Sequence, residues 1–261
     1  MKTALTIAGS DSSGGAGIQA DLKTFACNGV YGMSAVTGVT AQNTMGVFDI
    51  LTVPPDFLKK QIDAVVTDIF PDAVKIGMIS SSESIGIIFS SVKEFGLQNI
   101  VLDPVLVSTS GTALLETNSV LKLSELFPVS KIVTPNIPEA EVFSNIKIIN
   151  KGDMERAGRI IFDKWGCAVL VKGGHGKFGS EVCDFLVCSE GDFWFSEERI
   201  NNPNTHGTGC TLSSAICACL AKGMDLRQSV ESARSYLINT MKGGLNLGKG
   251  RGPLLHNFMF Q

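Results

Sequence analysis

The chain has 261 residues, of which 44% are hydrophobic and 18% are charged, and its formal net charge at pH 7 is −3. This composition supplies enough apolar side chains for a large core and excludes a disordered chain. No apolar run approaches the roughly 20 residues that a membrane-spanning helix needs, so we expect no membrane partner. No block of basic residues is present, which argues against nucleic acid as a partner.

The beginning of the chain and its cysteines both indicate a cytoplasmic protein. Residues 1–9 run from one lysine through a short apolar stretch into glycine, without the long apolar region of a signal peptide. The seven cysteines are odd in number and include no CxxC pair, which favours neither a disulfide framework nor a zinc ribbon. We expect Cys217 and Cys219 to be small core residues, in a reducing compartment.

Apolar runs typical of strands alternate with helical patterns along the whole chain. The expected strands are residues 4–8, 34–40, 47–53, 73–76, 100–102, 131–133, 168–171, 182–186 and 193–195. The expected helices are residues 17–28, a helix after the Pro54-Pro55 breaker, and residues 84–95, 118–126, 154–165, 210–222 and 225–242. The side chains expected on the inner face of the helix after Pro55 are Phe57, Leu58, Ile62, Val65 and Val66.

The short central strands are almost entirely apolar, which is typical of a parallel sheet covered by helices on both faces. The turn-like residues 189–192 predict an antiparallel hairpin at one edge of that sheet. No internal repeat and no linker interrupts the pattern. We therefore expect an α/β fold with a central, mostly parallel sheet flanked by helices on both faces, in one domain that spans residues 1–261.

The strongest functional signal is Gly207-Thr208-Gly209-Cys210, which opens a predicted helix. Ligands of open α/β sheets bind at the carboxyl ends of the strands, and this motif falls in such a position. The glycines permit a sharp turn, and the unpaired amides and dipole of a helix N-terminus attract anions. The motif therefore predicts a pocket for a phosphoryl group, although it is also compatible with a plain loop before a buried helix.

Cys210 and the hydroxyl residues after it extend this prediction. At a helix start the pKa of a thiol falls below its usual value of about 8.5, so a Cys210 thiolate can accept a proton from a substrate hydroxyl. Thr211 and Ser213 can add hydroxyl donors to the pocket. A cysteine near a helix start is more often inert than catalytic, so packing is the alternative role of Cys210.

Gly207-Thr208-Gly209-Cys210 resembles the anion-hole motif of the ribokinase-like superfamily, with Cys where most members carry Asp as the base. Residues 6–24 are similar to the first motif of its hydroxymethylpyrimidine/phosphomethylpyrimidine kinase branch, and pyridoxal kinases of that branch share much of both motifs. The resemblance covers essentially the whole chain. It implies a ribokinase-like fold, ATP and Mg²⁺ as cofactors, and a homodimer.

The resemblance also implies a substrate pocket over the first loop and helix, with Asp21 hydrogen-bonding the substrate. Residues 39–44 look like the pyrimidine branch, and the Gln42 side chain can donate and accept at once, which matches the ring nitrogen and amino group of an aminopyrimidine. Met78 and Val105 follow strands and would supply apolar walls. From the residues alone, each of these four positions is equally compatible with an ordinary surface or core residue.

Residues at other strand ends are assigned to ATP and magnesium. Asn136 and Glu139 are similar to the family's Asn-x-x-Glu motif, in which the carboxylate holds Mg²⁺, usually through water. A helix cap is the alternative for this pair. Asp103 is assigned as the second acid near the metal. Lys172 can reach ATP phosphate oxygens, and we place Asn136 and Thr211 with it in the nucleotide site.

Several rival functions can be compared with the same residues. Residues 15–20 fit the GxGxxA fingerprint of dinucleotide-binding proteins, but no acid for the ribose lies between Lys23 and Thr44. Cys210 and His206 can be paired as a Cys/His hydrolase, although no orienting acid is evident and His206 otherwise reads as a loop residue. A non-catalytic protein would bind a pyrimidine and leave ATP intact.

The expected function is the ATP-dependent phosphorylation of 4-amino-5-hydroxymethyl-2-methylpyrimidine, and then of its monophosphate to the pyrophosphate, for thiamine biosynthesis. Residues 41–44 favour the pyrimidine, and a pyridoxine/pyridoxal kinase of the same branch is the alternative. In this mechanism Mg²⁺ and Lys172 hold the ATP phosphates. The amides of residues 207–210 stabilise the charge that develops on the γ-phosphoryl group.

Overall fold

The computed structural model describes residues 1–106, 117–174, 176 and 181–260. Among these residues, nine strands form one sheet: β1 (Thr3–Asp11), β2 (Tyr31–Asn43), β3 (Gly46–Thr52), β4 (Ala73–Ile76), β5 (Ile100–Leu102), β6 (Ile132–Val133), β7 (Ala168–Val171), β8 (Glu181–Cys188) and β9 (Gly191–Glu198). The α-helices are α1 (Gly17–Cys27), α2 (Pro55–Val66), α3 (Ser82–Phe95), α4 (Thr117–Leu123), α5 (Ile137–Ser144), α6 (Lys151–Trp165), α7 (Thr208–Ala221) and α8 (Leu226–Lys242). Short 3₁₀ segments are η1 (Ser124–Val129) and η2 (Phe258–Phe260).

Across the sheet the strands lie in the order β3-β2-β1-β4-β5-β6-β7-β8-β9. The six strands from β2 to β7 in this order are parallel, while β3 at one edge and β8 and β9 at the other pair antiparallel with their neighbours. The predicted mostly parallel sheet and the edge hairpin of β8 and β9 are confirmed. The hairpin of β2 and β3 is not predicted, because its turn at Thr44 and Met45 carries no Asn-Gly or Asp-Gly signal.

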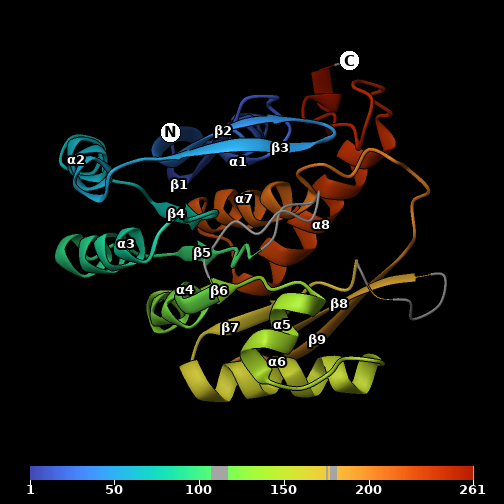
Figure 1. The fold of residues 1–261 in the computed structure, drawn as a ribbon. Helices are drawn as coiled ribbons and strands as arrows, with labels where there is room; N and C mark the ends of the chain where they lie inside the picture. Colours follow the sequence, from blue (N-terminus) through green and yellow to red (C-terminus); the bar gives the residue numbers. More distant parts are fainter. Residues whose placement is uncertain (107–116, 175, 177–180, 261) are drawn as a thin grey trace.

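Helices cover both faces of the sheet, as predicted (Figure 1). On one face α2, α3, α5 and α6 share a core with side chains such as Ile62, Ile88 and Ile161. On the other face α1, α7 and α8 pack through a second core that includes Phe25 and Ile216. The helix α7 is buried from residue 211 to residue 221, so it passes through the interior behind the sheet.

Three details of the helices differ from the expectation, and the first is that α5 (Ile137–Ser144) is not among the expected helices. Phe57, expected on the inner face of α2, is 57% exposed, because the buried stripe of that helix runs through Leu58 and Ile62. The helix expected over residues 118–126 is α-helical only to Leu123 and continues as η1. That segment contains Pro128, which has no backbone N–H with which to continue an α-helical ladder.

The parallel strands deliver their carboxyl ends to one edge of the sheet. The loops that follow β1, β4, β5, β6 and β7 gather there around the N-terminus of α7. Cys217 and Cys219 are buried in α7, as expected. Among the described residues, none of the helices combines the length and the apolar character that crossing a bilayer requires.

Candidate active site

A cavity of about 1000 Å³ lies at this edge of the sheet. Its wall combines the loops after the parallel strands, the end of β2 and the first turn of α7. The residues assigned from the sequence that line it are Gln42, Met78, Asp103, Val105, Asn136, Glu139, Lys172, Gly207, Thr208, Gly209 and Cys210. Asp21 and Thr211 do not line the cavity. The fold therefore brings most of the assigned residues together, although they come from distant parts of the sequence.

The first turn of α7 presents backbone amides that no described residue pairs with. Gly207 is the N-cap, with a φ of +86°, and its carbonyl accepts the first helical hydrogen bond, from Thr211 N at 2.8 Å. No hydrogen-bond acceptor among the described residues contacts the amides of Gly209 or Cys210. A Cβ at position 207 would lie 1.9 Å from Gly15 O, so both the φ and the packing require glycine. This arrangement is suited to binding an anion.

A Lys–Asp ion pair lies beside this helix start. Lys172 Nζ is 2.7 Å from Asp103 Oδ1. A Cβ at Gly209 would lie 3.4 Å from Asp103 Oδ2 and 3.6 Å from Lys172 Nζ, so the ammonium and the helix amides face the same space. Although burial opposes ionisation, Lys172 and Lys75 lower the pKa of Asp103. Burial also acts against the charged form of Lys172, but the charges of Asp103 and Glu139 raise its pKa. Lys172 and Asp103 are therefore both ionised.

Asn136 and Glu139 form a capping box at the start of α5. Asn136 Oδ1 accepts a hydrogen bond from Glu139 N at 3.0 Å, and Glu139 Oε2 accepts one from Asn136 N at 2.8 Å. The helix cap that the sequence left as an alternative is therefore present. Glu139 is nevertheless part of the cavity wall. Burial raises the pKa of its carboxyl, and the charge of Asp103 adds to this while Lys172 opposes it.

Cys210 lines the cavity, but the helix start does not activate its thiol. Burial raises the pKa of Cys210 to about 11. Lys75 opposes this rise, whereas the negative charges of Asp21 and Asp103 add to it. The expected lowering of this pKa is therefore wrong, because burial raises it more than the positive charge of Lys75 lowers it.

Asp21 lies beneath the cavity rather than in its wall. It is fully buried, and its carboxylate accepts hydrogen bonds from Thr6 Oγ1 and Ser214 Oγ, each at 2.6 Å, and from Lys75 Nζ at 2.9 Å. These partners occupy both carboxylate oxygens. We therefore revise the role of Asp21 from a substrate contact to an anchor between α1, β1, β4 and α7. The burial also excludes a solvated charge, the alternative that the sequence allowed.

Thr211 does not reach the cavity either. It is fully buried, and its Oγ1 lies 3.0 Å from His256 Nε2. Burial lowers the pKa of His256 to about 4, so the ring is neutral and Nε2 can accept the Thr211 proton. Ser213 is buried as well and donates to Gly209 O at 3.0 Å. The assignment of Thr211 to the nucleotide is therefore wrong: its hydroxyl holds the C-terminal segment against α7.

Gln42 lies where the pairing of β2 with β3 becomes irregular. The register shifts between Ala41 and Gln42, and such a bulge re-aims the side chain that follows it. Ser12 Oγ fixes the backbone at this point, because it donates to Gln42 O at 2.8 Å and accepts from Gln42 N at 2.9 Å. Met78 and Val105 lie in the wall of the same cavity. Polar and apolar groups thus converge on a space suited to a small ring.

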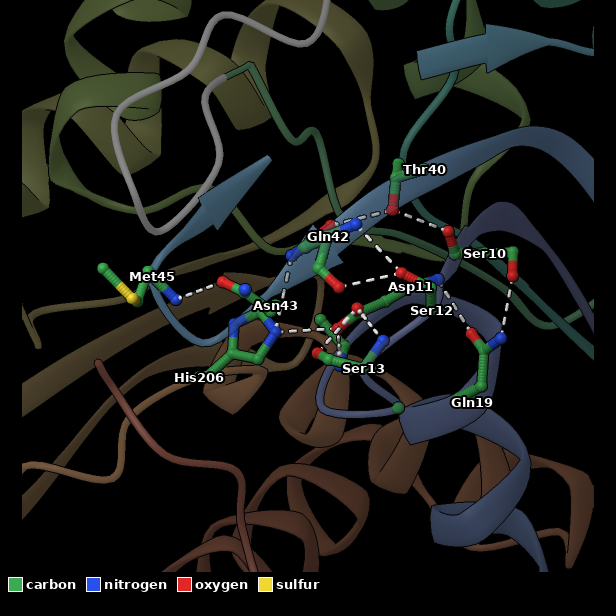
Figure 2. A network of polar contacts seen from close by, with 12 residues as sticks. Ser10, Asp11, Ser12, Ser13, Gln19, Thr40, Gln42, Asn43, Met45 and His206 are labelled. Carbon is green, nitrogen blue, oxygen red and sulfur yellow. Dashed lines mark hydrogen bonds and ion pairs between the residues drawn. The ribbon is translucent and has the colours of Figure 1, made fainter. Parts of the chain in front are cut away.

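The residues that the sequence interpretation missed are Asp11 and His206. Nε2 of His206 lies 2.7 Å from Asp11 Oδ2 and 3.4 Å from the side-chain amide of Gln42 (Figure 2). His206 lies in the segment before α7, as expected of a loop residue, but it is buried and lines the cavity. The sequence does not reveal the contact, because Asp11 and His206 are 195 positions apart. The available signal is that each residue lies at one of the two glycine-rich motifs, which the fold brings to the same edge.

Comparison with known protein families shows the family to which the chain belongs. Residues 11–255 match the family model described as phosphomethylpyrimidine kinase. The chain belongs to the phosphomethylpyrimidine kinase family. Over 262 residues it is 44% identical to the hydroxymethylpyrimidine/phosphomethylpyrimidine kinase of Haemophilus influenzae, a match that covers 98% of this chain and 97% of that protein.

Solved structures agree with this membership. The phosphomethylpyrimidine kinase of Clostridium difficile 630 is 45% identical, with a TM-score of 0.81, and the match covers 91% of this chain and 98% of that one. The pyridoxal kinase of Staphylococcus aureus, in complex with AMP-PCP and pyridoxal, is 32% identical, with a TM-score of 0.91 and coverages of 100% and 95%. The present chain is therefore a kinase with the ribokinase-like fold. This excludes the dinucleotide-binding, hydrolase and non-catalytic functions that the sequence left open.

Proposed function

We propose that this kinase transfers the terminal phosphoryl group of ATP to 4-amino-5-hydroxymethyl-2-methylpyrimidine, and then to the resulting monophosphate, giving the pyrophosphate for thiamine biosynthesis. Family membership and relatives named for both kinase activities support the proposal. A structural relative in complex with the ATP analogue AMP-PCP supports ATP as the donor. We also propose that residues 1–261 act as one kinase domain.

The unpaired amides at the start of α7 are the observation that carries the proposal. The amides of Gly209 and Cys210 face the space that Lys172 Nζ also faces. Phosphoryl transfer passes through a loose transition state whose charge is spread over the transferring oxygens, so its catalysis relies on positioned donors and cations. A helix N-terminus beside an ammonium group supplies both. A cavity of about 1000 Å³ also leaves room for a nucleotide beside a small ring.

The carboxylates beside Lys172 fit a magnesium ion. Asp103 and Glu139 supply oxygen ligands, which Mg²⁺ prefers. The charge of Asp103 adds to the effect of burial in raising the Glu139 pKa, and a cation would relieve this repulsion. Within the described part of the chain, no group of three ligating side chains is close enough to form a cage. This agrees with an ion that keeps water and takes phosphate oxygens as further ligands. Bound there, Mg²⁺ would neutralise charge on the ATP phosphates.

We assign Cys210 as the proton acceptor of the first step. The hydroxymethyl oxygen forms a bond to the γ-phosphorus while the bond to the ADP oxygen breaks, and the hydroxyl proton passes to the Cys210 sulfur. Because the Cys210 pKa is raised to about 11, only the minor thiolate form can accept this proton near neutral pH. A loose transition state tolerates this, since the attacking oxygen loses its proton late.

The second step has a different proton requirement. The phosphate of the monophosphate is already ionised near neutral pH, because its second pKa is about 6. Its oxygen can attack the γ-phosphorus without a base. The two steps can therefore share the amides of α7 and Lys172 while differing in their need for Cys210.

The choice of ring distinguishes the main proposal from its alternative. Gln42 in the cavity wall favours an aminopyrimidine, because its amide can donate to a ring nitrogen and accept from an adjacent amino group. The similarity to a pyridoxal kinase keeps pyridoxal as the second candidate substrate. Nucleotide turnover with the hydroxymethylpyrimidine, its monophosphate and pyridoxal tests the proposal. We expect the highest kcat/KM with the first two compounds, and turnover of pyridoxal alone would contradict it.

We further propose that the kinase is a cytoplasmic homodimer. The β2–β3 hairpin exposes apolar side chains, among them Phe48 at 70% and Leu51 at 72% exposure, and a second copy would cover them. All seven cysteines are free, as is usual in a reducing compartment. Light scattering after size exclusion should give a dimer for the wild type and a monomer for Phe48→Lys. A monomeric wild type would exclude the dimer.

A further inference from the structure

A buried ion pair in the cavity wall, between Asp184 of β8 and Arg234 of α8, has no role in the mechanism above. Both residues are buried, and Arg234 Nη1 donates a hydrogen bond to Asp184 Oδ2. The guanidinium also lies over the Phe195 ring, 5.7 Å from its centroid. Burial lowers the pKa of Arg234 to about 10, so the group is still charged near neutral pH. Arg234 therefore neutralises the Asp184 carboxylate and holds one of its two oxygens.

The other oxygen of Asp184 binds the backbone next to Lys172. The ladder between β7 and β8 ends with the residue before Lys172. Beyond that point Gly173 N donates to Asp184 Oδ1 at 2.8 Å, so a side chain takes the place of a backbone acceptor. A Cβ at Gly173 would lie 1.9 Å from Cys183 O, so the close approach of the two chains requires glycine. Asp184 thus connects α8 to the segment that carries Lys172.

Hydrogen bonds hold the peptide groups on both sides of the Lys172 Cα. On one side Lys172 N donates to Pro135 O at 2.8 Å, and on the other side Gly173 N donates to Asp184. Because peptide groups are planar, fixing both of them fixes the direction of the Cα–Cβ bond between them. At the far end of the side chain, Nζ donates to Asp103 Oδ1 at 2.7 Å. The flexible lysine stem is therefore held at both ends.

The position of the Lys172 ammonium matters because phosphoryl transfer depends on placed donors and cations. A Cβ at Gly209 would lie 3.6 Å from Lys172 Nζ, so the ammonium lies close to the first turn of α7. If the peptide between Lys172 and Gly173 turned, the stem would start in another direction and Nζ would move relative to the α7 amides. A misplacement of about 1 Å can lower a rate on the order of 100-fold.

We propose that Asp184 is a positioning residue for Lys172 and that Arg234 holds Asp184 in turn. Asp184 acts through the Gly173 amide and needs no contact with the transferring phosphoryl group. The inference rests on the proposed role of Lys172 at the ATP phosphates, and it names the residues that keep the ammonium in place. A packing role of the ion pair would instead affect stability without depending on Lys172.

Two double variants form a matched pair that isolates the hydrogen bond to Gly173. Asp184→Leu alone would leave Arg234 buried without its anion and can unfold the protein, so both variants also carry Arg234→Met. Asp184→Asn/Arg234→Met retains an oxygen that can accept from Gly173 N, whereas Asp184→Leu/Arg234→Met does not. Asparagine and leucine have nearly the same shape, so the two variants differ mainly in this acceptor.

The comparison is made on kcat at saturating ATP and substrate. We expect kcat of the leucine variant to be about tenfold or more below that of the asparagine variant, in both phosphorylation steps. KM for the pyrimidine should agree within about threefold between the two, since the displaced group is a phosphate cation. Urea unfolding checks that both variants are folded. Equal kcat, with a difference only in unfolding free energy, would make the bond to Gly173 structural and overturn the proposal.

A double-mutant cycle tests whether Asp184 acts through Lys172. In a Lys172→Gln background, the two double variants should agree in kcat within about twofold, because the ammonium whose position differs is gone. A tenfold difference that persists in this background would overturn the proposal.

The same experiment separates this inference from the proposed role of Lys172. If Lys172→Gln alone retains near-normal kcat, Lys172 does not act on the ATP phosphates and the positioning role falls with it. If Lys172→Gln loses most of its kcat while the two double variants are equal, only the positioning role of Asp184 is overturned.

Discussion

Lys75–Asp21 and Lys172–Asp103 are two buried ion pairs of the same residue types, with Nζ to carboxylate distances of 2.9 Å and 2.7 Å. Both side chains of the first pair are 0% exposed, and Thr6 and Ser214 complete the hydrogen bonds of the carboxylate. In the second pair the lysine is 14% exposed and lines the cavity. One pair is closed within the protein, and the other is open toward a ligand.

The comparison shows that a buried ion pair indicates a functional site only where one of its charged groups can still form hydrogen bonds to a ligand. The closed pair joins β4 to α1 beneath the cavity, so its contribution lies in holding the site together. The open pair keeps ammonium donors for a phosphate. Cys210 lies within the electrostatic influence of both pairs, since Lys75, Asp21 and Asp103 all affect its pKa.

The largest effect should follow from breaking the closed pair. Lys75→Met leaves Asp21 buried without its cation, so we expect the free energy of unfolding in urea to fall by about 3–5 kcal/mol. The double variant Lys75→Met/Asp21→Leu should recover most of that loss, because it removes both charges. A loss below about 1 kcal/mol in the single variant would show that the pair does not hold the site together.

Breaking the open pair should affect catalysis instead. Lys172→Gln removes a cation that faces the α7 amides, and we expect kcat for both phosphorylation steps to fall on the order of 100-fold. The loss of unfolding free energy should be smaller than in Lys75→Met, because solvent can reach Asp103 through the cavity. Steady-state kinetics and urea unfolding of the same preparation check both statements. Near-normal turnover with a large loss of stability would reverse our interpretation of the two pairs.

Cys210, between the two pairs, should distinguish the two steps. Cys210→Ala should lower the first step roughly 100-fold and leave the second nearly unchanged, because only the first needs a proton acceptor. With the Cys210 pKa raised to about 11, the thiolate fraction of the wild type rises about tenfold per pH unit below that value. The first-step rate should therefore rise between about pH 7 and pH 9 while the second stays flat. Equal losses of both steps would leave Cys210 as a packing residue.

The Asp11–His206 pair should have a smaller effect on the free energy of unfolding than the Lys75–Asp21 pair. The Asp11 pKa is lowered from 3.8 to about 2, so ionised Asp11 stabilises the folded state by about 2 kcal/mol above pH 4. That contribution is lost as the pH falls from about 4 to about 2, because the folded state then takes up the proton. Asp11→Asn should lose a similar free energy at pH 7 and show a weaker pH dependence of unfolding in this window. An unchanged pH dependence would contradict the assigned hydrogen bond between Asp11 and His206.

Much of the fold and the site is predictable, because both depend on local patterns. Short apolar runs predict the parallel strands, and the glycine-rich motif at residues 207–210 predicts the start of α7 and its free amides. Asn136, Glu139, Lys172 and Asp103 are found because polar residues at strand ends converge in a parallel sheet.

The remainder depends on contacts that no local pattern reveals. The burial of Asp21 is set by Lys75, which lies 54 positions away, and the network at Gln42 needs Asp11 and His206 to meet. The Cys210 pKa depends on how completely the fold excludes water, so the helix start alone predicts the wrong direction. Thr211 shows the same limit, since its first-turn position does not reveal that its hydroxyl faces His256.

The most direct test is a crystal structure of the protein with Mg²⁺, a non-hydrolysable ATP analogue and the hydroxymethylpyrimidine. We predict a γ-phosphate oxygen within hydrogen-bond distance of the Gly209 and Cys210 amides, with Lys172 Nζ on the same phosphate. A γ-phosphate bound elsewhere, with those two amides bonded within the protein, would contradict the account.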